Sequence, residues 1–175
     1  LGVVIVPQQT LSIPDVDETG LCFVENAILK ARNAAVLSGK PAIADDSGLE
    51  VDLLDGRPGI YSARYAGEGA TDSTNNQKLL EELGDSPLEK RSARYQCVIV
   101  YMRHANDPTP IICQGSWEGH IAFEPRGTEG FGYDPLFYLK DLDCHAAEIN
   151  KIEKNRISHR GKATAQLVEQ LRQSI

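Results

Sequence analysis

The stretch from Ala44 to Leu49 constrains this chain more than any other, because two acidic residues, a serine and a glycine follow directly on an apolar run. Residues 41–44 predict a short buried strand, so Asp45 and Asp46 should lie at its C-terminal end, where open α/β sheets bind their ligands. Strand alternation should point the two carboxylates in opposite directions. One would then hold a metal ion or a water, and the other would fix the loop. A plain strand-end turn is the alternative, since Asp, Ser and Gly are common turn formers.

Strand and helix signals alternate along the rest of the chain. Apolar and β-branched segments predict strands at 2–7, 94–103, 110–115 and 117–123, with an extended piece at 135–139. Helical spacing predicts helices at 21–38, at 75–83 and from Ser158 onward. Hairpin-like and crossover connections both occur, so the sequence predicts an α/β fold with a mixed central β-sheet flanked by helices. No linker divides residues 1–175, so we expect a single domain, which a long strand pair could shape into two lobes.

Composition excludes several classes of protein. The chain has 175 residues, of which 41% are hydrophobic and 25% are charged, as in ordinary globular domains. A net charge of −7 argues against duplex nucleic acid as the main partner, and the longest apolar runs are too short to span a membrane. The four cysteines lack CxxC spacing and suit reduced thiols, which indicates a cytoplasmic protein.

Oxygen and nitrogen donors suited to a phosphorylated ligand occur in the first third of the chain. Glu18 and Asp46 are the candidate ligands for Mg²⁺, which prefers one or two carboxylates together with substrate phosphates. Lys30 lies one helical turn from Asn26 on the same predicted face. Together with Ser47 and Arg64, it would donate to phosphate oxygens. The alternatives are a helix-start acid for Glu18, a solvated lysine, a turn hydroxyl and a surface arginine.

A second group of candidates lies near the C-terminus. Phe131 stands between two glycines, which allow the backbone to approach a flat ligand closely while the ring offers a stacking surface. Lys154, His159 and Arg160 would donate to a carbonyl oxygen of that ligand. An ordinary core aromatic for Phe131 and a structural role for His159 are the alternatives, and Ser158 is a candidate cap of the last helix.

Five motifs together resemble the bacterial branch of the noncanonical purine nucleoside triphosphate pyrophosphatases, the ITPase/RdgB family, from about Asp17 to the C-terminus. They are Asp46-Ser47-Gly48, the segment from Pro58 to Arg64, the segment from Gly130 to Pro135, Ala147-Glu148 with Lys154, and the segment from Ser158 to Gly161. The resemblance implies a Mg²⁺-dependent enzyme that hydrolyses dITP, ITP and XTP to monophosphate and pyrophosphate. It also implies a homodimer.

The same resemblance assigns roles to individual residues. It implies Asp46 as the catalytic proton acceptor and Glu18 and Asp46 as metal ligands, with Arg160 at the 6-oxo group of the purine. The implied substrate contacts are Lys30, Ser47, Arg64, Phe131, Gly132, Tyr133, Asp134, Lys154, His159 and Arg160.

One departure from the family pattern concerns the N-terminal end of the sequence. The family's first strand and its phosphate-binding Ser/Thr-x-Asn-x-x-Lys loop have no counterpart from Leu1 onward. Two alternatives therefore stay open: a Maf-type nucleotide pyrophosphatase acting on other bases, and a catalytically silent nucleotide-binding module. Phe131 and the segment from Ser158 to Gly161 argue against the Maf type.

Overall fold

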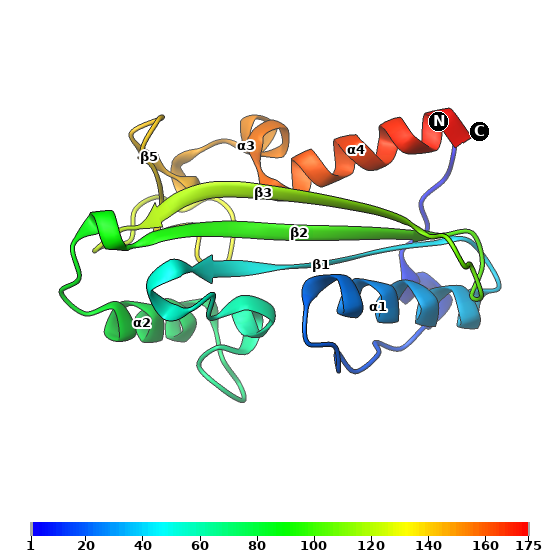
Figure 1. The fold of residues 1–175 in the computed structure, drawn as a ribbon, viewed down its shortest axis with the longest axis horizontal. Helices are drawn as coiled ribbons and strands as arrows, with labels where there is room; N and C mark the ends of the chain where they lie inside the picture. Colours follow the sequence, from blue (N-terminus) through cyan, green and yellow to red (C-terminus); the bar gives the residue numbers. More distant parts are fainter. Residues whose placement is uncertain (1, 175) are drawn as a thin grey trace.

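The computed structural model describes residues 2–174, and its centre is a five-stranded sheet in the order β1-β2-β3-β4-β5. Two long hairpin-forming strands follow one long edge strand, and two short strands close the other edge (Figure 1). The strands are β1 Ala42–Val51, β2 Ser92–Met102, β3 Ile111–Ile121, β4 Phe137–Leu139 and β5 Cys144–His145. Every described pairing is antiparallel.

Within the described residues four α-helices flank the sheet, and short 3-10 turns lie between the elements. They are α1 Phe23–Ser38, α2 Asp72–Leu83, α3 Lys151–Ile157 and α4 His159–Ser174. Helix α1 ends where Gly39 adopts a φ of 64°, a left-handed conformation that glycine tolerates. Thr71 and Thr74 form a capping box at the start of α2.

Helices α1 and α4 cover opposite faces of the sheet, and the alternation of β2 accounts for this. Val98, Val100 and Met102 face α1, where they join Phe23, Ala27 and Ala31 in one buried cluster. Cys97 and Ile99 point the other way and join Cys113 and three residues of α4, namely Ala163, Leu167 and Leu171. Figure 1 shows α1 below and α4 above the same end of the long strands.

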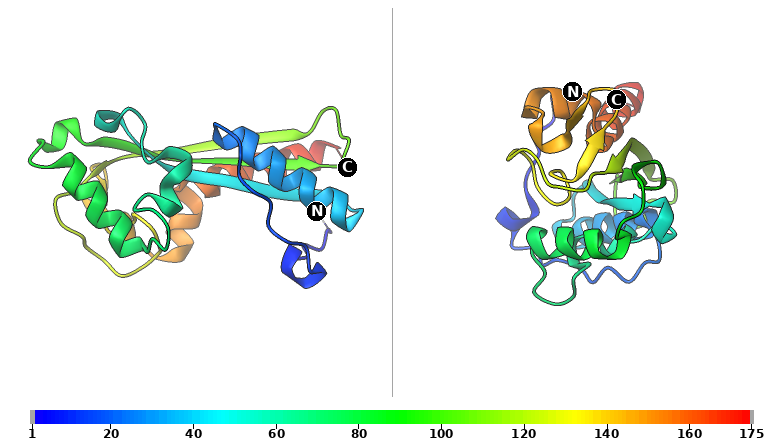
Figure 2. Two further views of the ribbon diagram at one scale, coloured as in Figure 1. Left: turned by 90° about the horizontal axis from the view of Figure 1, so that it is seen from below. Right: turned by 90° about the vertical axis from the view of Figure 1, so that its left-hand side faces the viewer.

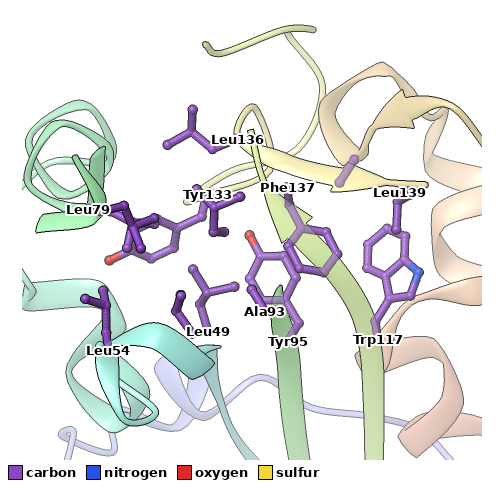
Figure 3. Packing of buried hydrophobic residues seen from close by; sticks show 14 of the residues in the cluster. Leu49, Leu54, Leu79, Ala93, Tyr95, Trp117, Tyr133, Leu136, Phe137 and Leu139 are labelled. Atoms are coloured by element: carbon purple, nitrogen blue, oxygen red, sulfur yellow. The ribbon is translucent and has the colours of Figure 1, made fainter. Parts of the chain in front are cut away.

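The other end of the sheet carries the largest buried cluster (Figure 3). Tyr95, Trp117 and Phe137 form its aromatic centre, with ring centroids 4.6 Å apart for Tyr95 and Phe137. Leu79 and Leu83 of α2 close it from one side. Phe131 lies on the loop before β4, and Tyr133 and Leu136 anchor that loop in this cluster.

The α/β class, with helices on a central sheet, is confirmed, and several details of the strands differ from the sequence-based expectation. The sheet is antiparallel in all described pairings, because each strand pairs with the next one along the chain and runs back beside it, without a crossover connection. The strand of Asp46 continues to Val51, so Asp45 and Asp46 lie within β1 and not at its end. Residues 111–121 form one strand in place of the two expected.

Residues 2–7 form no strand, and Val3, Val4, Ile5 and Val6 are exposed. β-branched residues favour an extended chain, but a strand also needs a partner, and this segment pairs with none of the described strands. The two views of Figure 2 show it beside the sheet and not within it. No described helix combines the length and the apolar character needed to cross a membrane.

Candidate functional site

A polar pocket of about 270 Å³ lies beside β1, the edge strand of the sheet, and the 3-10 turn Gly59–Arg64 also contributes to its lining. Its lining combines carboxylates with cationic side chains: Glu18, Lys30, Asp45, Asp46, Ser47, Ile60, Ala63, Arg64 and Arg160. Seven of these nine residues are polar or charged, so the pocket suits a charged ligand.

Lys30 joins two carboxylates in the pocket. Its Nζ lies 2.7 Å from Oδ1 of Asp46 and 3.0 Å from Oε1 of Glu18. Arg64 approaches the other oxygen of Glu18 at 3.4 Å. The residues come from four segments. Lys30 lies on α1, Asp46 on β1 and Glu18 on the loop before α1, while Arg64 ends the 3-10 turn Gly59–Arg64. The structure therefore brings together four of the residues that the sequence predicted to bind phosphate or metal.

Asn26 also contacts this cluster. Its position in the sequence indicates only that it shares a helix face with Lys30. The side chain of Asn26 is fully buried. Its Nδ2 donates to Oδ2 of Asp46 at 3.4 Å, and its Oδ1 accepts a hydrogen bond of 2.8 Å from the backbone N–H of Gly20. Asn26 thus ties the segment that carries Glu18 to the strand that carries Asp46.

The surroundings shift the pKa values of the two carboxylates, Asp46 and Glu18, in opposite directions. Burial raises the pKa of Asp46 above its ordinary value, and the opposing contacts with Lys30 do not cancel this effect. For Glu18 burial acts in the same direction, but hydrogen bonds and charge from Lys30 and Arg64 outweigh it and lower the pKa. Burial lowers the pKa of Lys30, yet Asp46 and Glu18 together raise it overall. Burial therefore favours proton uptake at Asp46, whereas the neighbouring cations favour the ionised form of Glu18.

The donor set fits a hard divalent cation. Oxygens of Glu18 and Asp46 already converge on one positive charge, the Nζ of Lys30. No group of three or more His, Cys, Asp or Glu side chains placed to hold a metal occurs in the described part of the chain. Two carboxylates with substrate phosphates are the usual protein environment of Mg²⁺, whereas zinc sites need more protein ligands.

Asp45 and Ser47 lie on the other face of β1, as strand alternation predicts for neighbours of Asp46. Nη2 of Arg160 donates to Oδ2 of Asp45 at 2.8 Å and to Oγ of Ser47 at 2.9 Å. Nε of Arg160 also reaches Oδ2 of Asp45, at 3.2 Å. This network anchors the start of α4 to the strand that carries Asp46.

Phe131 is exposed, which excludes the core-aromatic alternative. Its side chain lies on a loop, and the residue is 62% exposed. Nζ of Lys154 is 5.3 Å and Cζ of Arg160 is 5.9 Å from the centre of its ring. Two cationic groups therefore lie close to this exposed aromatic ring. Because Arg160 also lines the polar pocket, it connects the two parts of the site.

The remaining candidates near the C-terminus are buried beside this face. Asp134 is 2% exposed, forms an ion pair with Lys154 and accepts a hydrogen bond of 2.8 Å from the backbone N–H of Phe131. A Cβ on Gly130 would come within 2.1 Å of the Asp134 carboxylate, so this position requires glycine. Tyr133 lies in the core, where its hydroxyl donates to the backbone oxygen of Ser62.

His159 is also buried, and its ring stacks on Tyr95 with centroids 4.7 Å apart. Burial, together with the charges of Arg160 and Lys154, lowers the pKa of His159 to about 3, so the ring is neutral at physiological pH. Its Nδ1 has no hydrogen-bond partner among the described residues. Oγ of Ser158 accepts from the backbone N–H of Gly161 at 3.2 Å, so Ser158 caps the start of α4.

Fold and site together define an α/β protein with a sheet-edge pocket that joins carboxylates, cations and an exposed aromatic ring. The chain belongs to the Ham1 family, whose model matches residues 2–170.

Several relatives share most of the chain. It is 62% identical to the dITP/XTP pyrophosphatase of Shewanella oneidensis, over 95% of this chain and 81% of that protein. Identity to the dITP/XTP pyrophosphatase of Escherichia coli strain K12 is 58%, over 98% of this chain and 87% of the relative. The solved structure of a HAM1 protein from Coxiella burnetii superposes with a TM-score of 0.93 at 53% identity, covering 99% of this chain and 88% of that one.

Proposed function

We propose that this protein is a hydrolase that converts noncanonical purine nucleoside triphosphates, namely dITP, ITP and XTP, to the monophosphate and pyrophosphate. Relatives at about 60% identity carry the name dITP/XTP pyrophosphatase. The observation that carries the proposal for this chain is the shared position of Arg160, which lines the carboxylate pocket and flanks the exposed ring of Phe131. A ligand with a triphosphate at one end and a flat base at the other fits these two neighbouring features.

The phosphate end of the substrate would lie in the polar pocket. Glu18 and Asp46 would hold Mg²⁺, which supplies charge neutralisation on the phosphate oxygens and lowers the pKa of a bound water. Lys30, Ser47 and Arg64 would donate to phosphate oxygens. Asp46 would accept the proton of the attacking water, because burial raises its pKa and so favours proton uptake.

The base end would lie against Phe131. The exposed ring offers a stacking face, while Lys154 and Arg160 provide donors toward a 6-oxo oxygen. Adenine presents an amino donor at this position, so both donors would stay unpaired, which can reject a substrate by about 10⁴-fold. His159 is neutral and would contribute hydrogen bonding without charge. Gly132, Tyr133 and Asp134 would support the ring through the loop backbone.

We further propose a cytoplasmic homodimer that acts on nucleotides in the free pool, without nucleic acid or a membrane as partner. A net charge of −7 disfavours binding to polyanions and supports this choice of partner.

The test is hydrolysis of dITP, ITP, XTP, GTP and ATP in Mg²⁺, with both phosphate products quantified. We expect pyrophosphate and not orthophosphate, a strong preference for dITP, ITP and XTP, and loss of turnover with a chelator. Preference for other bases would favour the Maf-type alternative. Binding of ITP without turnover would favour a silent nucleotide-binding module.

A further inference from the structure

The loop that carries Phe131 is fixed by helix α2, which contributes nothing to the polar pocket itself. Oδ2 of Asp72 accepts a hydrogen bond of 2.7 Å from the backbone N–H of Gly132. Nδ2 of Asn76 donates to the backbone oxygen of Gly132 at 2.8 Å. Both polar groups of one glycine are therefore held by two side chains one turn apart on α2.

A loop of this kind needs external support. Gly130 and Gly132 have φ angles of 79° and 62°, so Phe131 lies between two residues in the left-handed region. Glycine enters this region easily but also leaves it easily, because it has no side chain to restrict its backbone. The exposed ring of Phe131 has little apolar contact to hold it. The hydrogen bonds to Gly132 and the bond from Phe131 to Asp134 replace that contact.

Helix α2 is a firm base for these contacts. Leu79 and Leu83 anchor it in the largest buried cluster, and Thr71 caps its first turn. Asn76 also donates to the backbone oxygen of Asp72 at 2.8 Å, while its own Oδ1 is buried without a hydrogen-bond partner. An unpaired buried oxygen destabilises the fold, because it has lost its hydrogen bonds to water. The hydrogen bonds that Nδ2 of Asn76 donates to Gly132 and Asp72 therefore offset the loss at its unpaired oxygen.

We propose that Asp72 and Asn76 are positioning residues that hold Phe131 in the orientation for stacking on the purine base. The proposal rests on the proposed function, since it requires Phe131 to contact the base. Neither residue touches the polar pocket, so both act through Phe131 and affect recognition of the base more than the chemistry at Asp46.

The test is a double-mutant cycle of Asn76→Ala and Phe131→Ala, read as kcat/KM for ITP in Mg²⁺. Losing a hydrogen bond of ordinary strength should lower kcat/KM by about twofold to tenfold in the Asn76→Ala protein, mainly through a higher KM. In the Phe131→Ala background the same substitution should change kcat/KM by less than about twofold, because the ring it positions is gone. Alanine is the better helix former, so α2 should stay folded.

The matched control is Gln77→Ala, at an exposed neighbour on α2 that contacts Glu81 and no loop residue. It should leave kcat/KM unchanged. An independent readout is amide hydrogen exchange at Gly132, which should become about fivefold faster in Asp72→Ala as its acceptor is lost.

Three outcomes would contradict the inference. Equal losses from Asn76→Ala in both backgrounds would mean that Asn76 does not act through Phe131. An Asn76→Ala protein indistinguishable from Gln77→Ala, or unchanged exchange at Gly132, would mean that α2 does not fix the loop. By contrast, full activity of Phe131→Ala alone would remove base stacking from the proposed function and the inference with it.

Discussion

Asp46 is the single residue whose environment most directly suggests chemistry, because it is buried, its pKa is raised by that burial, and it is paired with Lys30. Asp46→Asn should abolish turnover while leaving ITP affinity within roughly tenfold, since the change removes charge and basicity but almost no volume. Steady-state hydrolysis and equilibrium binding in Mg²⁺ measure the two effects separately.

The neighbouring carboxylate provides the comparison. Asp45→Asn changes the same chemical group one residue away, on the face of β1 that contacts Arg160. It should retain measurable turnover and weaken discrimination between bases. Near-normal turnover by Asp46→Asn would exclude Asp46 as the proton acceptor.

Arg160 provides a prediction on specificity. Arg160→Ala should depress ITP and XTP hydrolysis far more than the slow hydrolysis of ATP, because adenine offers no acceptor at position 6. The preference for ITP over ATP, measured as a ratio of kcat/KM values, should collapse. A common loss for all three substrates would instead assign Arg160 to the phosphates or the fold, leaving base recognition to Lys154 and His159.

His159 links stability to pH. Its pKa is about 3 in the folded protein, below the ordinary 6.5, so the unfolded chain binds a proton first as the pH falls. The free energy of unfolding should therefore decrease below pH 6.5, by up to about 1.4 kcal/mol per pH unit from this residue. His159→Phe, which keeps an aromatic ring against Tyr95, should flatten the slope between pH 6.5 and about pH 5 in urea titrations. An unchanged slope would assign the pH dependence to other groups.

The predictability of the site differed from residue to residue for physical reasons. Alternation in a strand was enough to predict that Asp45 and Asp46 diverge, and helical spacing was enough to place Asn26 and Lys30 on one face. The contacts from Asp72 and Asn76 to Gly132 depend on how α2 lies against a loop far away in sequence. No local pattern reports such a contact.

At the scale of elements, the contact between α4 and β3 fixes the position of His159 and Arg160. A Cβ on Gly115 of β3 would come within 2.2 Å of the backbone oxygen of His159 and 2.9 Å of the backbone nitrogen of Ala163. Gly115→Ala should therefore displace the start of α4 and destabilise the fold by about 1–3 kcal/mol. Thermal unfolding should show a lower midpoint, and the preference for ITP over ATP should fall because Arg160 moves.

Gly119→Ala on the same strand is the comparison for that prediction, since its Cβ would meet Phe137 and Tyr138 and not α4. It should lower the unfolding midpoint without a comparable change in substrate preference. If both variants changed the substrate preference equally, the contact between Gly115 and α4 would not be what positions Arg160.

Helices and strands were predictable where the local hydrophobic periodicity was strong. They were not predictable where a strand forms only if another strand pairs with it. The helix at 21–38 and the strand at 94–103 were confirmed within two residues as α1 and β2. Residues 2–7 have equally strong β-branched composition, yet form no strand because no described strand pairs with them. The short helix α3 was not predicted, since five of its seven residues are polar or charged and its two isoleucines give no clear period.

At the scale of the whole molecule, strand β2 makes the three buried clusters interdependent. Tyr95 lies in the cluster at the β4 end, Cys97 and Ile99 lie under α4, and Val98, Val100 and Met102 lie under α1. One cluster cannot lose its structure without releasing residues of the same strand from the other two. The two ends of the sheet should therefore unfold together.

Met102→Ala tests this coupling from one end of the molecule. Met102 is fully buried beside α1, so its truncation should destabilise the protein by about 2–5 kcal/mol. Trp117, the one tryptophan of the chain, lies in the cluster at the opposite end and reports that end by fluorescence. In urea, the Trp117 transition and the far-UV circular dichroism of the helices should shift to lower midpoints by the same amount. Two independently folding lobes would instead leave the Trp117 midpoint where it is in the unsubstituted protein, because the missing Met102 contacts would then concern only the α1 end.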